Sequence, residues 1–132
     1  MTARTWIAVA LAAASAGVAQ GFGRFTLGVV LPAVRDDLGL SNTVVGSVAT
    51  ANVGAYLVGT LAVAAVSSYL RLLAIMRIGL MVSVGGLVLA AVAPNALVLG
   101  AAMFLSGFGG AWVWIPTPVS YTHLTLPTIL LV

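Results

Sequence analysis

The chain of 132 residues contains no cysteine, lysine or glutamate, and only 5% of its residues are charged. Without cysteine it has no disulfide framework and no thiolate metal site. The five arginines never cluster, which excludes a nucleic-acid-binding surface. Two adjacent aspartates and one histidine assemble neither paired carboxylates, nor a catalytic triad, nor a metal cluster. We therefore expect neither an enzyme nor a cofactor-binding or nucleic-acid-binding protein.

What the chain does contain is apolar sequence: 62% of its residues are hydrophobic, and the mean hydropathy is +1.23. A soluble domain of this size cannot bury so much apolar surface inside itself. A membrane-spanning helix needs roughly 20 mainly apolar residues, and four segments qualify. These are residues 6–31, 43–66, 72–92 and 96–115. The sequence predicts an all-α, polytopic transmembrane helix bundle over residues 1–118, in contact with membrane lipid.

The arginines predict how these spans cross the membrane. With four spans, Arg4, Arg71 and Arg77 fall on one side and Arg35 alone on the other. The excess of positive charge marks the cytoplasmic side, so the N-terminus is predicted to be cytoplasmic. Spans one and four then run in opposite directions.

The start of the chain has a second interpretation as a cleaved signal peptide. Arg4 supplies a basic first region, and Gly17-Val18-Ala19 loosely matches a cleavage site. Because apolar sequence continues to Leu31 and three further spans follow, we favour an uncleaved first span.

One pattern occurs twice in the chain, about 86 residues apart. Gly21-Phe22-Gly23 precedes Pro32, and Gly107-Phe108-Gly109 precedes Pro118, with eight residues between glycine and proline each time. Gly/Pro-interrupted spans in corresponding positions are typical of transporters built from structural repeats, whose site lies where the broken spans meet. The predicted directions of spans one and four make this an inverted repeat.

Arg24 is the most informative residue of span one. It shares one face with Gly17, Gly21 and Gly28, whose small size lets a neighbouring helix approach closely. Arg24 is therefore predicted to face the bundle, and an ionisable residue within a span is a functional hypothesis by default. The alternative is that Arg24 snorkels to the outer head groups, about 12 Å away.

Polar and small residues also align in the later spans. Asn52, Tyr56 and Gly59 share one face of span two. This face has two interpretations: it lines a substrate cavity, or its polar groups form hydrogen bonds between helices. Small residues in span three predict a packing seam: Gly79, Ser83, Gly86 and Ala90. The candidate pathway residues are Arg24, Gly21, Gly23, Asn52, Tyr56, Gly107 and Gly109.

Span four, from Leu99 to Ala111, resembles the fourth-helix motif of the major facilitator superfamily, l-x-x-x-R-x-x-q-G-x-g-a-a. The leucine, both motif glycines and the closing alanine match, whereas Met103 stands for the motif's Arg and Ser106 for its Gln. The stretch Gly21-Phe22-Gly23-Arg24-Phe25 leading to Leu31-Pro32-Ala33 looks like the YbfB/YjiJ-type branch. The resemblance covers about residues 6–118.

This resemblance implies a secondary transporter that works by alternating access, with helices one and four lining the path of a small-molecule substrate. It also implies a bacterial inner-membrane location and a coupling proton. Because Met103 stands where the motif has arginine, our hypothesis is that Arg24 supplies the buried cation instead. Family members typically have twelve spans, so the chain is expected to be an N-terminal fragment that lacks its C-terminal helices. Residues 119–132 change texture abruptly and are predicted to be a non-native tail.

Two other functions remain open from the sequence. One is a complete four-span protein that dimerises as a small-molecule exporter, although the small multidrug resistance family relies on a membrane-embedded glutamate that this chain lacks. The other is a non-transporting module that packs against a partner through its Gly/Ala stripes.

Overall fold

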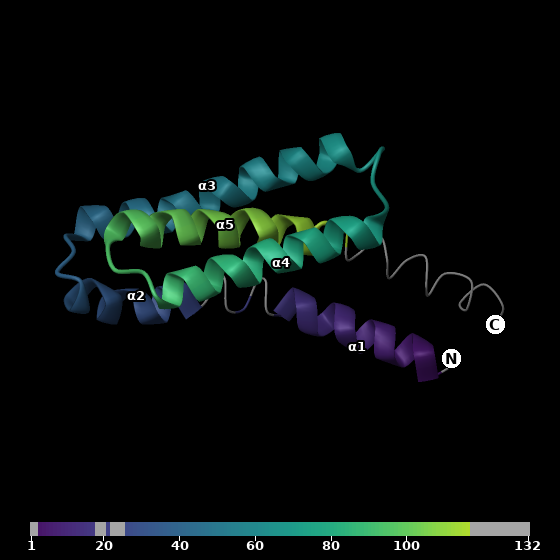
Figure 1. Cartoon of the computed structure of the whole chain (residues 1–132), viewed down its shortest axis with the longest axis horizontal. Coiled ribbons are helices and arrows are strands. Elements are labelled where there is room, and N and C mark those ends of the chain that lie inside the picture. The colour runs from purple at the N-terminus through teal and green to yellow at the C-terminus, as the bar shows by residue number, and fades with distance from the viewer. Residues whose placement is uncertain (1–2, 18–20, 22–25, 117–132) are drawn as a thin grey trace.

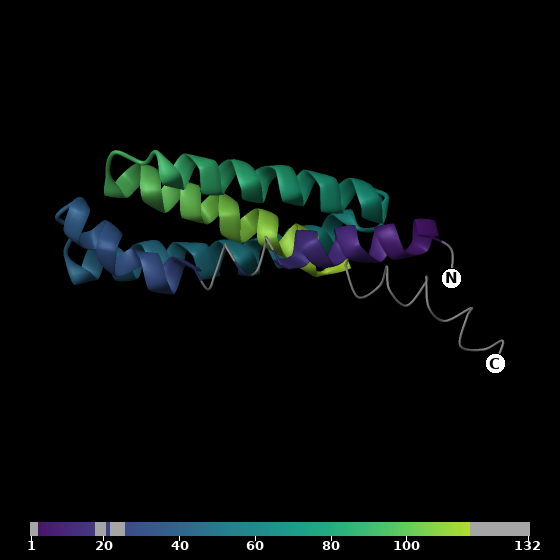
Figure 2. The same cartoon turned by 90° about the horizontal axis from the view of Figure 1, so that it is seen from below.

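The computed structural model describes residues 3–17, 21 and 26–116, which form helices and short connections without any strand. The predicted all-α class is confirmed. Figure 1 shows α5 lying lengthwise between α3 and α4, with α1 and α2 one after the other beside them. The view from below in Figure 2 shows the same elongated arrangement. The five helices are α1 (Ala3–Gly17), α2 (Thr26–Asp37), α3 (Asn42–Val66), α4 (Leu72–Ala91) and α5 (Ala96–Trp114).

Three of these helices are long and apolar enough to cross a membrane. They are α3, α4 and α5, with 25, 20 and 19 residues and hydropathies of 1.6, 2.2 and 1.7. Their bounds agree with predicted spans two, three and four to within one residue at each end. Long apolar segments separated by polar turns therefore sufficed to locate these helices.

The first predicted span lies over two shorter helices, α1 and α2, of 15 and 12 residues. Whether residues 6–31 form one crossing stays a prediction. Following the chain from its N-terminus in Figure 1, α1 runs opposite to α5, while α3 runs in the same direction as α5. The opposite directions of α1 and α5 are those that the inverted repeat requires.

The connection that was predicted to begin at Pro32 starts later in the structure, because α2 continues through Pro32 to Asp37. Proline removes one backbone hydrogen bond from a helix interior. Tertiary contacts offset this cost, since Val34 and Leu38 pack against the buried cluster described below. Helix α2 ends at Asp37, and Gly39 in the turn that follows has a φ of +61°, the left-handed conformation in which glycine commonly terminates a helix.

Side chains at the turns define where two of the long helices begin. The Ser41 hydroxyl accepts a hydrogen bond from the Val44 backbone N–H at 3.3 Å, which makes Ser41 the N-cap of α3. Asn95, which the sequence analysis did not single out, caps α5 in the same way, with its Oδ1 accepting from the Val98 N–H at 3.0 Å.

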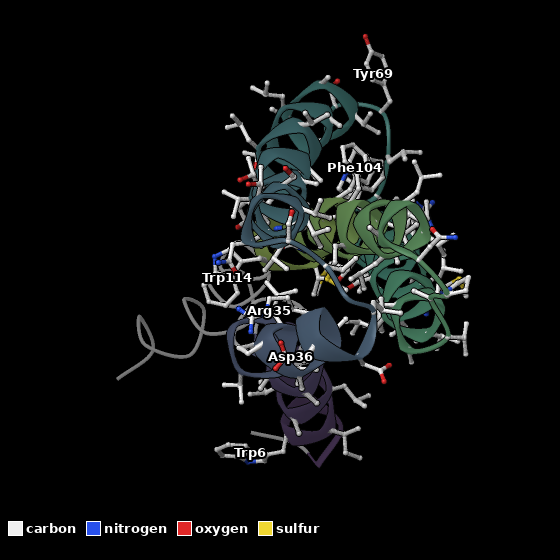
Figure 3. All side chains as sticks on the ribbon, turned by 90° about the vertical axis from the view of Figure 1, so that its left-hand side faces the viewer. Trp6, Arg35, Asp36, Tyr69, Phe104 and Trp114 are labelled. Atoms are coloured by element: carbon white, nitrogen blue, oxygen red, sulfur yellow. The ribbon has the colours of Figure 1, made fainter. Side chains whose placement is uncertain are left out.

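The corner between α2 and α3 is held by one arginine. Arg35 donates two hydrogen bonds to Asp36 Oδ1, at 2.9 and 2.6 Å, and one to Asn42 Oδ1 at 3.0 Å. Figure 3 shows Arg35 and Asp36 together at the end of the bundle that faces the viewer. Because Asn42 is the first residue of α3, the bond from Arg35 to Asn42 joins the end of α2 to the start of α3.

A cluster of buried apolar residues lies toward this same end of the bundle. Its buried residues are Val48 of α3 and Leu99 and Met103 of α5, each 4% exposed. Residues from α2 and α4 and from the turns that follow them complete the cluster: Val34, Leu38, Leu40, Leu87, Ala90 and Ala93. All four helices from α2 to α5 therefore contribute to one core, which fixes their mutual positions at this end.

Candidate functional site

Helix α5 is the central element of the bundle. Half of its best membrane-spanning window is buried, compared with 28% for α3 and 22% for α4. Its sequence allows this because glycine, alanine and serine let neighbouring backbones approach closely on two sides. Each of these two sides contacts a different helix, and the two interfaces are built differently.

The α3–α5 interface is centred on Asn52. This side chain is 2% exposed, and its Nδ2 donates a hydrogen bond of 2.8 Å to the Met103 carbonyl oxygen. Gly107, one turn further along α5, makes room for it. A Cβ placed on Gly107 would lie 3.0 Å from the carbonyl carbon of Asn52 and 3.1 Å from its Nδ2. The hydrogen bond between the helices thus depends on glycine at position 107.

A second close approach lies farther along the same interface. A Cβ on Gly59 would lie 2.8 Å from the Phe108 carbonyl oxygen and 3.0 Å from the Ala111 Cβ. Asn52 and Gly59, which were predicted to share one face of span two, therefore both lie directly against α5. That face was interpreted either as a cavity lining or as a source of interhelical hydrogen bonds, and for Asn52 the structure shows the hydrogen bond.

The α4–α5 interface consists of small residues. A Cβ on Gly86 would lie 2.6 Å from the Ser106 backbone nitrogen, and one on Gly109 would lie 2.5 Å from the Ser83 nitrogen. A Cβ on Gly79 would lie 2.8 Å from the Gly109 carbonyl oxygen. The predicted packing seam of span three is confirmed, and its partner is the glycine-rich half of α5.

Two serine hydroxyls in this interface have no hydrogen-bond partner among the described residues. Ser83 and Ser106 are 0% and 1% exposed, and the Oγ atom of each is unpaired. By contrast, the hydroxyls of Ser47, Thr50 and Thr60 on α3 each donate to a backbone carbonyl four residues earlier. An unsatisfied buried polar group costs about 1–3 kcal/mol. The α4–α5 interface is therefore close-packed but polar atoms within it are not satisfied.

The structure separates the predicted pathway residues into different surroundings. Asn52 and Gly107 meet in the α3–α5 interface, whereas Gly109 contacts α4. Tyr56 lies one turn after Asn52 on α3 and is half-buried, and Gly21 is half-buried as well. The remaining two predicted residues, Arg24 and Gly23, lie outside the described residues.

Aromatic residues of α5 lie against each other. The rings of Phe108 and Trp112 are 5.5 Å apart between centroids and tilted by 35°. The Trp112 side chain also adjoins Gly79 of α4. Figure 3 shows Phe104 on the side of α5 toward α3 and Tyr69, away from α1.

Two open grooves lie outside the two interfaces. One, of about 560 Å³, is lined by the α2–α3 corner, including Arg35, Asp36 and Asn42. The other, of about 450 Å³, lies on α3 beside Ala49, Thr50, Val53 and Gly54. Within the described ranges, no three acidic, histidine or cysteine side chains come together in a way that could hold a metal ion.

The two features that most distinguish the interfaces could not be predicted from the sequence. Met103 and Ser106 were noted only as departures from a motif. The Met103 backbone carbonyl nevertheless binds Asn52, and the Ser106 hydroxyl is buried with no hydrogen-bond partner in the described part of the chain. The contact between Asn52 and Met103 joins residues 51 positions apart. No local pattern in the sequence contains this pairing.

Three long apolar helices packed through glycines and one buried amide define an integral membrane protein with a helical transmembrane bundle. The family model described as "Uncharacterised MFS-type transporter YbfB" matches residues 16–126. The chain therefore belongs to this family of the major facilitator superfamily, as the motifs of spans one and four predicted. The match extends past Val119 into the predicted tail, whose origin stays a prediction. No curated protein and no solved structure matches the chain.

Proposed function

We propose that this chain is part of a secondary active transporter that moves a small solute across the membrane by alternating access. Membership of the YbfB-type family is the observation that carries this proposal. The glycine-rich packing of α5 is consistent with it, because a helix beside a transport path must hold its position without bulky side chains between the helices.

The proposed path runs between the first predicted span and α5. Arg24, Gly21, Gly23 and Tyr56 are proposed to line it. Asn52, Gly107 and Gly109 contribute from behind this lining, by holding α5 against α3 and α4. Met103 stands where the superfamily motif has arginine, so Arg24 is the proposed buried cation for an anionic substrate group or for proton coupling.

The role of Arg24 in transport can be tested with the full-length gene product. The protein is purified and reconstituted in liposomes that contain a pH-sensitive dye. Candidate solutes are screened for proton movement on addition, and Arg24→Ala is then compared with Arg71→Ala. Arg71 is an exposed residue whose side chain makes no capping hydrogen bond at the start of α4. We expect Arg24→Ala to abolish the signal and Arg71→Ala to retain it. Normal transport by Arg24→Ala would contradict the proposed role.

We further propose that this chain supplies the first helices of a twelve-span protein. This proposal can be tested separately from the role of Arg24. Genomic DNA read past codon 119 should continue as an open frame encoding about eight more apolar spans. An early stop codon would instead favour a complete four-span exporter or a helix-packing module.

The proposed orientation places the N-terminus in the cytoplasm of a bacterial cell, with the protein in the inner membrane. Single cysteines introduced at Ser68 and at Asp37, which lie in the predicted second and first connections, distinguish the two sides of the membrane. A membrane-impermeant thiol reagent added to intact cells should label position 37 and leave position 68 unmodified. The reverse pattern would contradict the orientation.

A further inference from the structure

The outward face of α4 carries one charged residue in an otherwise apolar stripe. Arg77 is exposed, and the residues at i−4, i+4, i+7 and i+11 from it lie on the same side of the helix. These residues are between 42% and 76% exposed: Leu73, Met81, Val84 and Val88. Figure 2 shows α4 along one edge of the bundle, beside α5. In a transmembrane bundle, this stripe faces lipid.

Arg77 lies below the level of the lipid head groups. The 20 residues of α4 span about 30 Å, which equals the thickness of the hydrocarbon core. Arg77 comes after the helix start at Leu72 by five positions, so its backbone lies about 7.5 Å inside that core. Because helical side chains point toward the helix N-terminus, the guanidinium is directed back to the head groups at the start of α4.

The charge of Arg77 is not compensated within the chain. The two acidic residues of the sequence, Asp36 and Asp37, lie at the opposite end of the bundle, where α2 ends (Figure 1). Among the residues that the structure describes, Arg77 makes no ion pair and no hydrogen bond. A guanidinium binds phosphate oxygens with two parallel hydrogen bonds. Since no carboxylate neutralises Arg77, a phospholipid with a net negative charge is favoured over a zwitterionic one.

The other residues of this face favour a lipid over another helix. On its opposite face, α4 meets α5 through Gly79, Ser83 and Gly86, whose small size permits close approach. The stripe has leucine, methionine and valine instead, which suit contact with acyl chains. From Arg77 to Val88 the stripe extends about 16 Å, close to the roughly 15 Å of hydrocarbon in one leaflet. One acyl chain therefore fits along it.

We propose that the α4 stripe, formed by Leu73, Arg77, Met81, Val84 and Val88, binds one anionic phospholipid. The lipid phosphate accepts hydrogen bonds from the Arg77 guanidinium, and an acyl chain lies along the apolar residues that follow. The lipid occupies the leaflet in which α4 begins. Because the site is on the outside of the bundle, the proposal does not depend on the proposed transport function.

Helix α3 offers a matched control stripe in the same chain. Leu61, Leu57 and Val53 are exposed and lie on one side of α3. Helix α3 ends at Val66, at the end of the bundle where α4 begins. Leu61 therefore lies at about the same depth as Arg77, about 7.5 Å from the end of its helix. The two stripes contact the same leaflet, but α3 has leucine where α4 has arginine.

Photo-crosslinking in nanodiscs tests the proposal. The chain is reconstituted in equal amounts of phosphatidylglycerol and phosphatidylcholine, with a trace of one of these lipids carrying a diazirine in an acyl chain. Peptide mass spectrometry then gives the ratio of anionic to zwitterionic labelling for each stripe, so differences in side-chain reactivity cancel. We expect this ratio to be about fivefold higher on the α4 stripe than on the α3 stripe, as one arginine near anionic lipid predicts.

Substitutions show whether Arg77 causes the difference. Arg77→Gln should lower the α4 ratio to that of the α3 stripe, and Arg77→Lys should retain most of it because the charge is kept. Arg71→Gln removes an equal charge outside the stripe and should leave the ratio unchanged. Circular dichroism verifies that each variant keeps its helices.

Equal ratios for the two stripes in the unsubstituted chain would overturn the proposal, because lipid would then surround the bundle without preference. An equal loss for Arg71→Gln and Arg77→Gln would also overturn it, since general attraction to positive charge would explain the labelling. Protection of the α4 stripe from both probes would show that protein covers this face, and would contradict a lipid site there.

Discussion

The α3–α5 and α4–α5 interfaces both depend on small residues of α5, at different positions, but these residues admit different groups from the neighbouring helix. Between α3 and α5, one glycine admits a buried amide that binds the neighbouring backbone. Between α4 and α5, glycines face backbone atoms and the Trp112 side chain, and two serine hydroxyls stay unpaired among the described residues. Small residues therefore provide close approach, whereas a polar side chain of the right length provides a defined alignment. Substitutions in the two interfaces should therefore differ in their effects on stability.

Substitution at Gly107 should have the largest effect, because it acts on both packing and the hydrogen bond. The added methyl of Gly107→Ala would meet the backbone of Asn52. We expect a loss of about 1–3 kcal/mol in unfolding free energy, measured by circular dichroism during SDS titration in micelles. Gly54→Ala is the matched control, since no atom lies within 4 Å of a Cβ at Gly54. Equal losses for both variants would contradict the close contact at Gly107.

Neighbouring glycines of α4 provide a sharper pair for the second interface. A Cβ on Gly86 would lie 2.6 Å from the Ser106 nitrogen, whereas one on Gly85 meets no atom within 4 Å. Gly86→Ala should cost about 1–2 kcal/mol in the same titration. Gly85→Ala should be neutral or slightly stabilising, because alanine favours helices over glycine. A greater loss for Gly85→Ala would show that α4 faces α5 differently.

Removing the Asn52 amide should have a moderate effect. Asn52→Leu keeps a similar volume but eliminates the bond to Met103, and hydrogen bonds between membrane helices are worth about 0.6 kcal/mol on average. We expect a loss near this value, together with faster hydrogen exchange of the α5 amides near Met103. Asn52→Asp tests the donor specifically: a protonated carboxyl can donate, so acid conditions should restore stability. Stability of Asn52→Leu equal to the unsubstituted chain would refute the bond's contribution.

The smallest effect is expected for Ser106. Because its hydroxyl has no partner among the described residues, Ser106→Ala should leave the unfolding free energy unchanged or raise it by up to about 1 kcal/mol. The comparison with Asn52→Leu is the informative one: removal of the paired polar group should destabilise, and removal of the unpaired one should not. A clear loss on Ser106→Ala would mean that the hydroxyl is hydrogen-bonded in the membrane.

Much of this fold could be predicted because its elements are local. Apolar length located α3, α4 and α5, and the polar turns between them determined their ends. The Ser41 cap followed from a short-range rule. The course of α2 was less predictable, since proline and three charged residues usually mark a connection. Only the contacts of Val34 and Leu38 with the core account for its continuation to Asp37.

The candidate site was predictable in part. The face of Asn52 and Gly59 on span two and the seam of span three follow from helical periodicity. What each face contacts does not follow from periodicity, because the same stripe of small residues serves lipid, a cavity or another helix. Gly107 and Gly109 illustrate this, as they are two residues apart yet contact α3 and α4 respectively.

The sequence by itself determined that this is a membrane protein with apolar helices, and its motifs identified the family. Hydropathy, helix length and capping depend on residues close together in the chain, so they can be read without a structure. The tertiary structure alone decided that α5 is central and that Asn52 binds the Met103 carbonyl. It also decided that the Ser83 and Ser106 hydroxyls are buried with no hydrogen-bond partner among the residues that the structure describes. These depend on which helices meet and at what alignment, which is set by contacts between residues far apart in the chain.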